Sequence, residues 1–357
     1  MNRFNIASIV TLGLLMSCAA NPAYDSSKAH HTASGFRNVC CVDDKGWLDF
    51  VKWRWQRFFK EIPTADDAHF EIETEHHAFL RSNSEKATLT WIGHATFLIQ
   101  FCGLNLLTDP HFSERASPVS WAGPRRVVPP AMEIRDLPEI DAVILSHDHY
   151  DSLDLASVSA LAIHNRQRTL TFLVPLGMKS WFDGINLGMS QVVELDWAES
   201  HTIDGVTFTA EPSQHWGKRT FFDTFRRLWA SWVIEGSGHR LYFAGDTGYA
   251  NHFKELGQKY GQFDLALLPI GGYEPRWFMK SYHVNPEESV QIHLDLKSKH
   301  SVAMHWGTFV LTDEPLDEPP ARLAAAVKKY DMDESTFEVY KHGETRFLDP
   351  LFVKPED

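Results

Sequence analysis

The residues Asp141-Ala-Val-Ile-Leu-Ser-His-Asp-His-Tyr-Asp151 give the clearest indication of how this 357-residue chain folds. The first six are typical of a short buried strand. His147 and His149 follow at the end of that strand, two residues apart, which places them on the same side of the backbone. Asp151 adds an anionic oxygen, and imidazole with carboxylate suits zinc or a similar divalent ion. The pattern predicts the first half of a metal site, although a His-x-His pair taken alone also fits a polar loop.

The composition indicates a folded protein with a substantial core. Hydrophobic residues make up 43% of the 357 residues, enough for one large or two modest domains. The formal net charge of -13 argues against nucleic acid as a partner, because binding a polyanion requires a basic surface. The chain has 12 Trp, several of them near Arg or Lys, and this mixture suits a membrane surface better.

The N-terminus has the pattern of an export signal, predicted at residues 1–17. Arg3 precedes an apolar run at 6–16 that is too short to span a bilayer. The sequence Leu15-Met-Ser-Cys18 resembles the lipobox of bacterial lipoproteins, whose Cys becomes the acylated first residue of the mature chain. Acylation of Cys18 would anchor the protein to a membrane, and Ala19 indicates the periplasmic face of the outer membrane. A cleaved signal with a chance Cys is the alternative.

Two further segments precede the main domain. Residues 18–38 are polar and are expected to form a tether. The segment 39–86 contains a run at 47–60 in which Trp and Phe alternate with basic residues along a helical stripe. We expect this segment to pack on the core, and a position in a lipid headgroup layer is the alternative. The pairing of the remaining Cys40, Cys41 and Cys102 stays open, and their odd number leaves at least one thiol free.

From residue 87 onward, β-rich runs alternate with helical patterns. Helices are predicted near 153–164, 249–260, 286–297 and 318–330. Strands are predicted at 87–92, 97–101, 104–108, 141–146, 170–174, 192–195, 202–210, 231–235, 240–244, 265–269, 301–305 and 337–340. This order favours an α+β fold, with two mixed β-sheets face to face and helices on the outside, over a doubly wound parallel sheet.

Three more short motifs follow predicted strands, and each carries a candidate metal ligand. They are Pro212-Ser-Gln-His215, Gly245-Asp246-Thr247 and Ala303-Met-His305. Each is weak by itself, because a His or Asp at a strand end is more often structural. In this order, after His-x-His-x-Asp, they resemble the metallo-β-lactamase superfamily. Longer phrases such as Tyr273-Glu-Pro-Arg-Trp-Phe-Met-Lys280 resemble the N-acylphosphatidylethanolamine-hydrolysing phospholipase D family, and the likeness runs from about residue 36 to 349.

The resemblance implies a metallo-β-lactamase αββα sandwich with a zinc site. One zinc ion would be held by His147, His149 and His215, and the second by Asp151 and His305, with Asp246 bridging the two. Two ions held in this way can trap a hydroxide and neutralise the charge that builds up at phosphorus.

One position departs from the family pattern. The motif continues His-x-His-x-Asp-His, whereas the sixth residue here is Ser152, and a hydroxyl is a poor zinc ligand compared with imidazole. Three consequences are open: a weakly held second ion, a single ion, or altered or lost activity. Replacement of the missing ligand by the nearby Asp154 is a further alternative.

Several other residues are candidates for supporting roles. Asp109 resembles the superfamily's buried Asp that orients a ligand His. His283 is a candidate catalytic residue that touches phosphate or protonates the leaving alkoxide. Arg276 and Lys280 are candidate substrate-binding residues for a phosphate, with structural ion pairs as the alternative. We interpret His94 as structural, because the family places no ligand there.

The function implied by the resemblance is zinc-dependent hydrolysis of N-acylphosphatidylethanolamine-like glycerophospholipids to phosphatidic acid and N-acylethanolamine. Metal-bound hydroxide would attack phosphorus, and Asp246 and His283 would take part. A Phe- and Arg-rich run at 218–229 is expected to touch lipid, with a buried connection as the alternative. Two other functions stay open: hydrolysis of small soluble phosphate esters or phosphorylated lactones, and lipid binding in the envelope by a lapsed site.

These expectations assign the hydrolase domain to residues 87–357. The expected partners are a membrane phospholipid and the membrane surface. A homodimer is compatible with the family, but no stretch of the sequence establishes one.

Overall fold

The computed structural model of the chain describes residues 20–39, 42–64 and 69–352. The predicted signal, the acylation of Cys18 and any pairing of Cys40 or Cys41 therefore lie outside the described residues. Within them, Cys102 carries an exposed thiol that forms no disulfide. No helix of the described part is long and apolar enough to cross a membrane.

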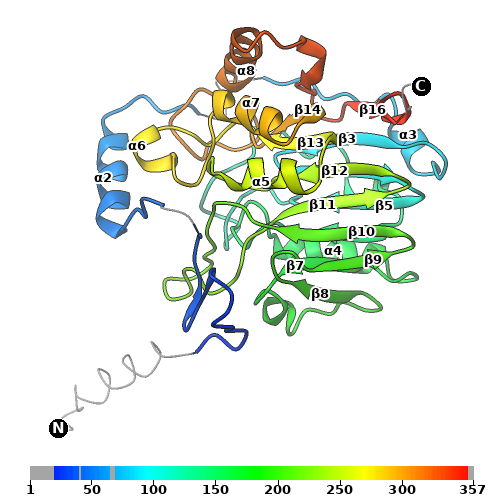
Figure 1. The fold of residues 1–357 in the computed structure, drawn as a ribbon, viewed down its shortest axis with the longest axis horizontal. Coiled ribbons are helices and arrows are strands. Elements are labelled where there is room, and N and C mark those ends of the chain that lie inside the picture. Colours follow the sequence, from blue (N-terminus) through cyan, green and yellow to red (C-terminus); the bar gives the residue numbers. More distant parts are fainter. Residues whose placement is uncertain (1–19, 40–41, 65–68, 353–357) are drawn as a thin grey trace.

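Two seven-stranded sheets form the centre of the molecule, as Figure 1 shows. The first sheet has the order β16-β3-β4-β5-β6-β7-β8 and contains β3 (Thr88–Gly93), β4 (Thr96–Phe101), β5 (Leu104–Thr108), β6 (Ala142–Ile144), β7 (Thr171–Pro175), β8 (Gln191–Leu195) and β16 (Thr345–Phe347). The second has the order β15-β14-β13-β12-β11-β10-β9 and contains β9 (Ser200–Ile203), β10 (Val206–Glu211), β11 (Ser231–Gly236), β12 (His239–Phe243), β13 (Phe263–Pro269), β14 (Ser298–Met304) and β15 (Phe337–Glu338). Both sheets mix parallel and antiparallel pairs, so the two mixed sheets of the prediction are confirmed.

Side chains alternate between two cores along the first sheet. In β4, Phe97 and Ile99 join the core shared with the second sheet, while Leu98 between them joins the core on the outer face. This alternation follows from the two-residue period of a strand. Because all these positions are buried, the strand has no solvent-exposed face, and the sheet is covered on both sides.

Helices complete the outer layers. The helices are α2 (Trp47–Phe58), α3 (His77–Leu80), α4 (Leu155–His164), α5 (His252–Lys259), α6 (Arg276–Met279), α7 (Pro286–Asp295) and α8 (Glu318–Lys329). Val158 and Leu161 of α4 belong to the outer core of the first sheet. On the second sheet, α7 packs against β13 and β14, with α5 and α8 beside it. The layers are therefore helix, sheet, sheet, helix.

The predicted strand at 202–210 is wrong in one respect, because it consists of two strands. β9 and β10 form an antiparallel hairpin that turns at Asp204-Gly205. Both residues have positive φ, 45° and 85°, which is the backbone of a two-residue hairpin turn. The other predicted strands and the four predicted helices match elements of the structure to within a few residues.

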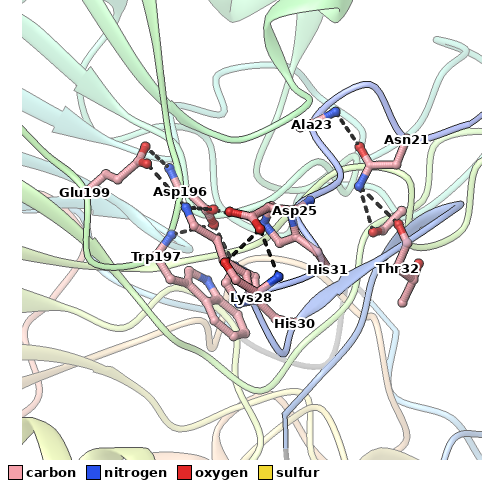
Figure 2. A network of polar contacts seen from close by, with 12 residues as sticks. Asn21, Ala23, Asp25, Lys28, His30, His31, Thr32, Asp196, Trp197 and Glu199 are labelled. Carbon is pink, nitrogen blue, oxygen red and sulfur yellow. Dashed lines mark hydrogen bonds and ion pairs between the residues drawn. The ribbon is translucent and has the colours of Figure 1, made fainter.

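The predicted tether is also corrected, because residues 20–38 fold against the body. They form a small hairpin of β1 (His31–Thr32) and β2 (Gly35–Phe36). Figure 2 shows the contact that holds this segment: Lys28, His30 and His31 surround the buried carboxylate of Asp196. Three donors converge on one anion, so the segment has a defined position that a polar composition did not predict.

Helix α2 packs on the body through one face only. Trp53 is buried, stacks on Phe278 at 5.1 Å between ring centroids and donates its indole N–H to Asp313. Trp55 and Phe58 on the other faces are 67% and 82% exposed. The expected packing of the 39–86 segment on the core thus holds for one side of this helix. On the other side, Trp55 and Phe58 make ring contacts with Phe59 and stay largely exposed.

Candidate metal centre

The candidate site lies where several strands end. His147, His149 and Asp151 follow β6, His215 follows β10, Asp246 follows β12 and His305 follows β14. β12, β13 and β14 are parallel to one another, so their carboxyl ends lie at one edge of the sheet. β6 is likewise parallel to β5 in the facing sheet. Loops at such an edge can bring residues from distant parts of the chain together.

The first group of ligands is the three histidines predicted from the sequence. The candidate ligand atoms of His147, His149 and His215 all lie within 4.8 Å of one another. Nδ1 of His149 and Nε2 of His215 are 3.1 Å apart. His147 and His215 are fully buried. Imidazole nitrogens this close and this well shielded from water suit a metal ion better than hydrogen bonding to one another.

Neighbouring groups fix which nitrogen of each ring faces the centre. Nδ1 of His215 lies 3.0 Å from the carbonyl oxygen of Tyr282 and donates its proton there. Nδ1 of His147 lies 2.8 Å from Oγ of Ser146. In each ring Nε2 is then left with a free lone pair for a metal.

Asp109 acts on this group through Ser146 and not by direct contact. Its carboxylate accepts hydrogen bonds from the backbone N–H and the hydroxyl of Ser146, at 2.7 and 2.5 Å. Because the hydroxyl donates to Asp109, it accepts from His147. Burial raises the pKa of Asp109 well above its usual value, against the two hydrogen bonds from Ser146. The predicted orienting role of Asp109 therefore involves one intermediate residue.

A second group of candidate ligands lies beside the first. Oδ2 of Asp151 is 3.4 Å from Nε2 of His305 and 3.1 Å from Nε2 of His94. Oδ2 of Asp246 is 3.1 Å from Nε2 of His305. The same Asp246 oxygen lies 3.7 and 3.9 Å from Nε2 of His147 and His215. Asp246 thus stands between the two groups, which is the position that the resemblance implies for a bridging ligand.

The electrostatics of the second group reflect its two carboxylates. Burial disfavours charge on His305, but Asp246 and Asp151 outweigh it and raise the pKa of His305 well above its usual value. Burial acts in the opposite direction on the pKa of Asp246, which the neighbouring His305 nevertheless holds well below its usual value. A concentration of buried charge of this kind is typical of a functional site.

The residues fit a bound metal ion. Buried polar atoms that have no hydrogen-bond partner within the described residues belong to the two groups, among them Nε2 of His147 and Oδ1 of Asp246. A buried polar group without a partner costs about 1–3 kcal/mol, so a protein rarely leaves several together without a ligand. The donor set of imidazole and carboxylate is one that zinc and similar ions prefer.

The structure tests the alternatives raised for Ser152. The residue is buried, and its hydroxyl has no hydrogen-bond partner within the described residues. Oδ2 of Asp154 accepts from the backbone N–H and the hydroxyl of Ser157 and from the hydroxyl of Ser113, so this oxygen caps helix α4. Asp154 also belongs to none of the candidate ligand groups of the described residues. The structure therefore gives no support to a replacement of the missing ligand by Asp154.

Of the other predicted residues, His283 lies at the site. The guanidinium of Arg276 is instead engaged by other groups of the protein. The candidate ligand atoms of His283, His215 and Asp246 lie within 4.8 Å of one another. Arg276 donates to the carbonyl of His283 at 2.7 Å and to Glu288 at 2.6 Å, so it is the structural ion pair of the two alternatives. Lys280 is exposed, and the described residues give it no ion pair.

A residue that the sequence interpretation assigned to structure belongs to the second group. His94 lies in the turn between β3 and β4, and its Nε2, Asp151 and His305 offer ligand atoms within 4.8 Å of one another. Sequence order hides this residue, because it precedes the His-x-His-x-Asp motif by more than fifty positions. The available signal was the Gly93-His94 pair at a tight turn next to a strand end.

A third cluster consists of His30, His31 and Asp196. These residue types can bind a metal, but here their polar atoms are hydrogen-bonded to one another. Both histidines hydrogen-bond to Asp196, and the ammonium of Lys28 shares one of its oxygens at 2.5 Å. The backbone N–H of Asp25 donates to Nδ1 of His31, which places the proton of that ring on Nε2, facing Asp196. The groups satisfy one another, so this cluster is an anchor for the N-terminal segment.

Comparisons with known proteins agree with this site. The family described as "Beta-lactamase superfamily domain" matches residues 104–306. The chain is 42% identical over 265 residues to the N-acyl-phosphatidylethanolamine-hydrolyzing phospholipase D 1 of Caenorhabditis elegans, covering 71% of this chain and 74% of that protein. It is 36% identical over 241 residues to the mitochondrial enzyme of that name from Saccharomyces cerevisiae, covering 66% of this chain and 50% of that protein.

Solved structures support the fold. The isothiocyanate hydrolase from Delia radicum gut bacteria matches with a TM-score of 0.57 at 22% identity, covering 72% of this chain and 98% of that one. At this identity the likeness shows the fold alone. With the sequence relatives and the ligand groups, it shows a metal-dependent hydrolase with the metallo-β-lactamase fold. The chain belongs to the N-acylphosphatidylethanolamine-hydrolysing phospholipase D family of the metallo-β-lactamase superfamily.

Proposed function

We propose that the protein is a zinc-dependent phosphodiesterase that hydrolyses N-acylphosphatidylethanolamine-like glycerophospholipids to phosphatidic acid and an N-acylethanolamine. The observation that carries the proposal is the position of Asp246, whose Oδ2 lies within 3.1–3.9 Å of ligand nitrogens of both groups. One carboxylate between two ligand groups is the arrangement of a two-metal site for phosphoryl transfer. The phospholipase activity named for the relatives from Caenorhabditis elegans and Saccharomyces cerevisiae supports the lipid class.

The bound metal would supply Lewis acidity, neutralise charge on the phosphoryl oxygens and lower the pKa of water to about 7. The residues of the chain hold and orient these parts. His147, His149 and His215 would hold one ion and Asp151 and His305 the other, with Asp246 between them. Ser146 and the Tyr282 carbonyl keep the rings of His147 and His215 turned toward the centre. Fixed donors of this kind need no rearrangement during the reaction.

His283 is placed to act on the leaving group. Its ring lies 5.2 Å from that of His215 and 5.5 Å from that of His305, so it borders both groups. Burial lowers the pKa of His283 to about 4, partly offset by Asp246, and the ring is therefore neutral near pH 7. A neutral imidazole has one N–H donor, which would hydrogen-bond the departing alkoxide or a phosphoryl oxygen. Arg276 serves by holding the backbone of His283 in place.

A groove next to the site would take part of an amphipathic substrate. It has a volume of about 670 Å³, and its lining includes Tyr150, Trp181, Leu155 and Arg219. Tyr150 stands between the ligands His149 and Asp151 in the sequence. The lining also includes the cationic Arg115 and Arg227 and the acidic Glu114, Asp154 and Asp223, and this mixed surface would suit the polar glycerol part of a phospholipid.

Exposed aromatic residues would bring the protein to a membrane surface. Phe221 and Phe222, in the loop that borders the groove, are 82% and 85% exposed. The outer faces of α2 add Trp55 and Phe58. Aromatic side chains next to Lys and Arg favour the lipid headgroup layer. Together with acylation of Cys18, this would keep the protein on the periplasmic face of the outer membrane.

Hydrolysis of lipid vesicles tests the proposal. We expect purified protein to release N-acylethanolamine and phosphatidic acid from vesicles that contain N-acylphosphatidylethanolamine, to stop after chelation, and to recover with zinc. His147→Ala should lose metal and turnover together, while His293→Ala, which removes a buried His bonded to Ser301 away from the site, should keep both.

Three results would contradict the proposal. Undiminished turnover by metal-free His147→Ala would refute the metal-dependent mechanism. Hydrolysis of water-soluble phosphate esters with none of vesicle lipid would favour the soluble-substrate alternative. Protein purified without chelator that holds no metal would favour a lapsed lipid-binding site.

A further inference from the structure

We propose that His94 is a metal ligand of the second group and takes the place left by Ser152. The inference rests on the metal-dependent chemistry of the proposed function and is independent of the lipid substrate. Without His94, the second group would have only Asp151, His305 and the shared Asp246. With it, the group has four protein ligands, the usual number for a tightly held zinc ion.

The distances agree with ligands around one ion. Nε2 of His94 and Nε2 of His305 lie 3.1 and 3.4 Å from the same oxygen of Asp151. Nε2 of His305 lies 3.1 Å from Asp246. Tetrahedral ligands that bind an ion at 2.0–2.2 Å are about 3.3–3.6 Å from one another. These three pairs of candidate ligands are therefore already close to the spacing that an ion requires.

The backbone holds His94 firmly in this position. Its N–H donates to Oγ of Thr308 at 2.8 Å, and its carbonyl accepts from Nε1 of Trp91 at 2.9 Å and from the N–H of His305 at 3.0 Å. The last bond joins the two candidate ligands directly through their main chains. Ligands fixed in this way keep their geometry with little loss of entropy on binding.

His94 and His305 also share an unusual backbone conformation. His94 and His305 have φ of 55° and 59°, in the left-handed region that few residues other than Gly adopt. Such backbone costs about 1–3 kcal/mol and is concentrated at functional sites. A small cavity of about 20 Å³ is lined by both side chains and by Gly272.

The alternative is that His94 only donates a hydrogen bond to Asp151 from outside the metal site. The two roles differ in what the ring does in the loaded protein. As a ligand, Nε2 would bond the ion at about 2.0–2.1 Å. As an outer partner, it would stay hydrogen-bonded to the carboxylate, and the ion would have one protein ligand fewer.

Metal counting in His94→Asn tests the inference. Asn tolerates the left-handed backbone but is too short to bring a ligand atom to the position of Nε2. We expect wild-type protein, loaded with zinc and freed of excess, to hold two ions per chain and the variant one. His111→Asn is the matched control, because His111 is equally buried and also contacts Phe309, at 5.0 Å against 5.2 Å for His94, but it belongs to neither ligand group. The control should keep two ions.

Anomalous diffraction from zinc-loaded wild-type crystals gives a second readout that does not depend on whether the variant folds. We expect a peak bonded to Nε2 of His94. Two ions in His94→Asn, a second ion without a bond to His94, or a single ion in the wild-type chain would each overturn the inference. Neither readout uses lipid hydrolysis, so failure of the phospholipid proposal would leave both results interpretable.

Discussion

Each histidine of the site has two nitrogens, and the partner of one decides the chemistry of the other. The carbonyl of Tyr282 and the hydroxyl of Ser146 take the Nδ1 protons of His215 and His147. The Nε2 lone pairs then face the centre. The Ser146 hydroxyl also connects His147 to the buried Asp109, which the Tyr282 carbonyl does not do for His215. A residue outside the candidate ligand groups thus sets the basicity and orientation of a candidate ligand.

Replacement of Ser146 tests this arrangement. Ser146→Ala removes the acceptor for His147 and one of the two donors to Asp109. We expect the affinity of the first group for zinc to fall by about 10–100-fold, measured by competition with a coloured chelator. We also expect a loss of about 1–3 kcal/mol in the free energy of unfolding, because Asp109 stays buried with fewer hydrogen bonds.

The control for Ser146 is a serine with an equally buried hydroxyl elsewhere. Ser289→Ala removes a hydrogen bond of 2.7 Å to the carbonyl of Pro269, so it changes stability but should leave zinc affinity as it is. Equal zinc affinity in Ser146→Ala and wild-type protein would show that Ser146 does not orient the ligand.

At the scale of single residues, sequence motifs predicted the candidate ligands that follow strands and left out His94, which does not follow one. His147, His215 and His305 stand in short motifs at predicted strand ends, and the structure brings them together. His94 stands in a turn of a meander, where only the folded positions of β3 and β14 reveal its neighbours. Arg276 was a candidate for phosphate binding because of its guanidinium group. The sequence could not show that Glu288 would form an ion pair with it.

One face of helix α2 packs against the protein, and the opposite face is exposed to solvent. Trp53 is fixed by Phe278 and Asp313, while Trp55, two residues further on, is 67% exposed. Two residues of helix correspond to a rotation of about 200°, so the two indoles point away from each other. One helix can therefore be attached to the body and present aromatic side chains outward.

The two tryptophans give a matched pair of variants. We expect Trp55→Ala to bind phospholipid vesicles about tenfold more weakly than wild-type protein with no change in melting temperature, because it loses only exposed apolar surface. Trp53→Ala should instead release the helix and speed protease cleavage within 42–64. Vesicle sedimentation and limited proteolysis measure the two effects. Unchanged vesicle binding by Trp55→Ala would remove α2 from the proposed membrane surface.

Secondary structure was predictable where pattern and turn signals agreed. The helices at 155–164 and 286–295 begin at the capping residues Asp154 and Asn285, whose side chains accept from the third helical N–H. The hairpin of β9 and β10 was predicted as one strand, although Asp204-Gly205 is a strong hairpin signal. The β-rich residues on both sides masked that turn.

For the molecule as a whole, the order of strands and helices was sufficient to predict two stacked sheets, since a doubly wound sheet needs a helix between nearly all strands. The position of residues 20–38 was not predictable. Their composition is that of a linker, and the anion that holds them, Asp196, lies more than 150 residues away. Asp196 stands between β8 of the first sheet and β9 of the second, so the segment crosses the edge where the sheets meet.

This N-terminal anchor should depend on the charge of Asp196. Burial would raise the pKa of Asp196, but hydrogen bonds from His30 and Lys28 outweigh burial and lower it. A carboxylate whose pKa is depressed by folding stabilises the folded state above its unfolded value of 3.8, and that contribution is lost as the pH falls through the lower folded value. The stabilisation is therefore fully present near neutral pH.

Asp196→Asn removes the charge and keeps the shape of the side chain. We expect it to lower the free energy of unfolding by about 2–4 kcal/mol near pH 7, because three donors, two of them buried histidines, lose an anionic partner. The difference between the two proteins should shrink below pH 3.8, because Asp196 takes up a proton there in the unfolded wild-type chain while it stays ionised in the folded one. Urea unfolding of both proteins from about pH 7 to about pH 3 measures it. Glu199→Gln keeps an acceptor for the backbone N–H of Asp196 and loses charge only at a half-exposed contact of 3.4 Å with Lys28, so it should cost about 0–1 kcal/mol at any of these pH values. A cost of Asp196→Asn that stays constant down to the lowest pH would show that shape, and not charge, holds the segment.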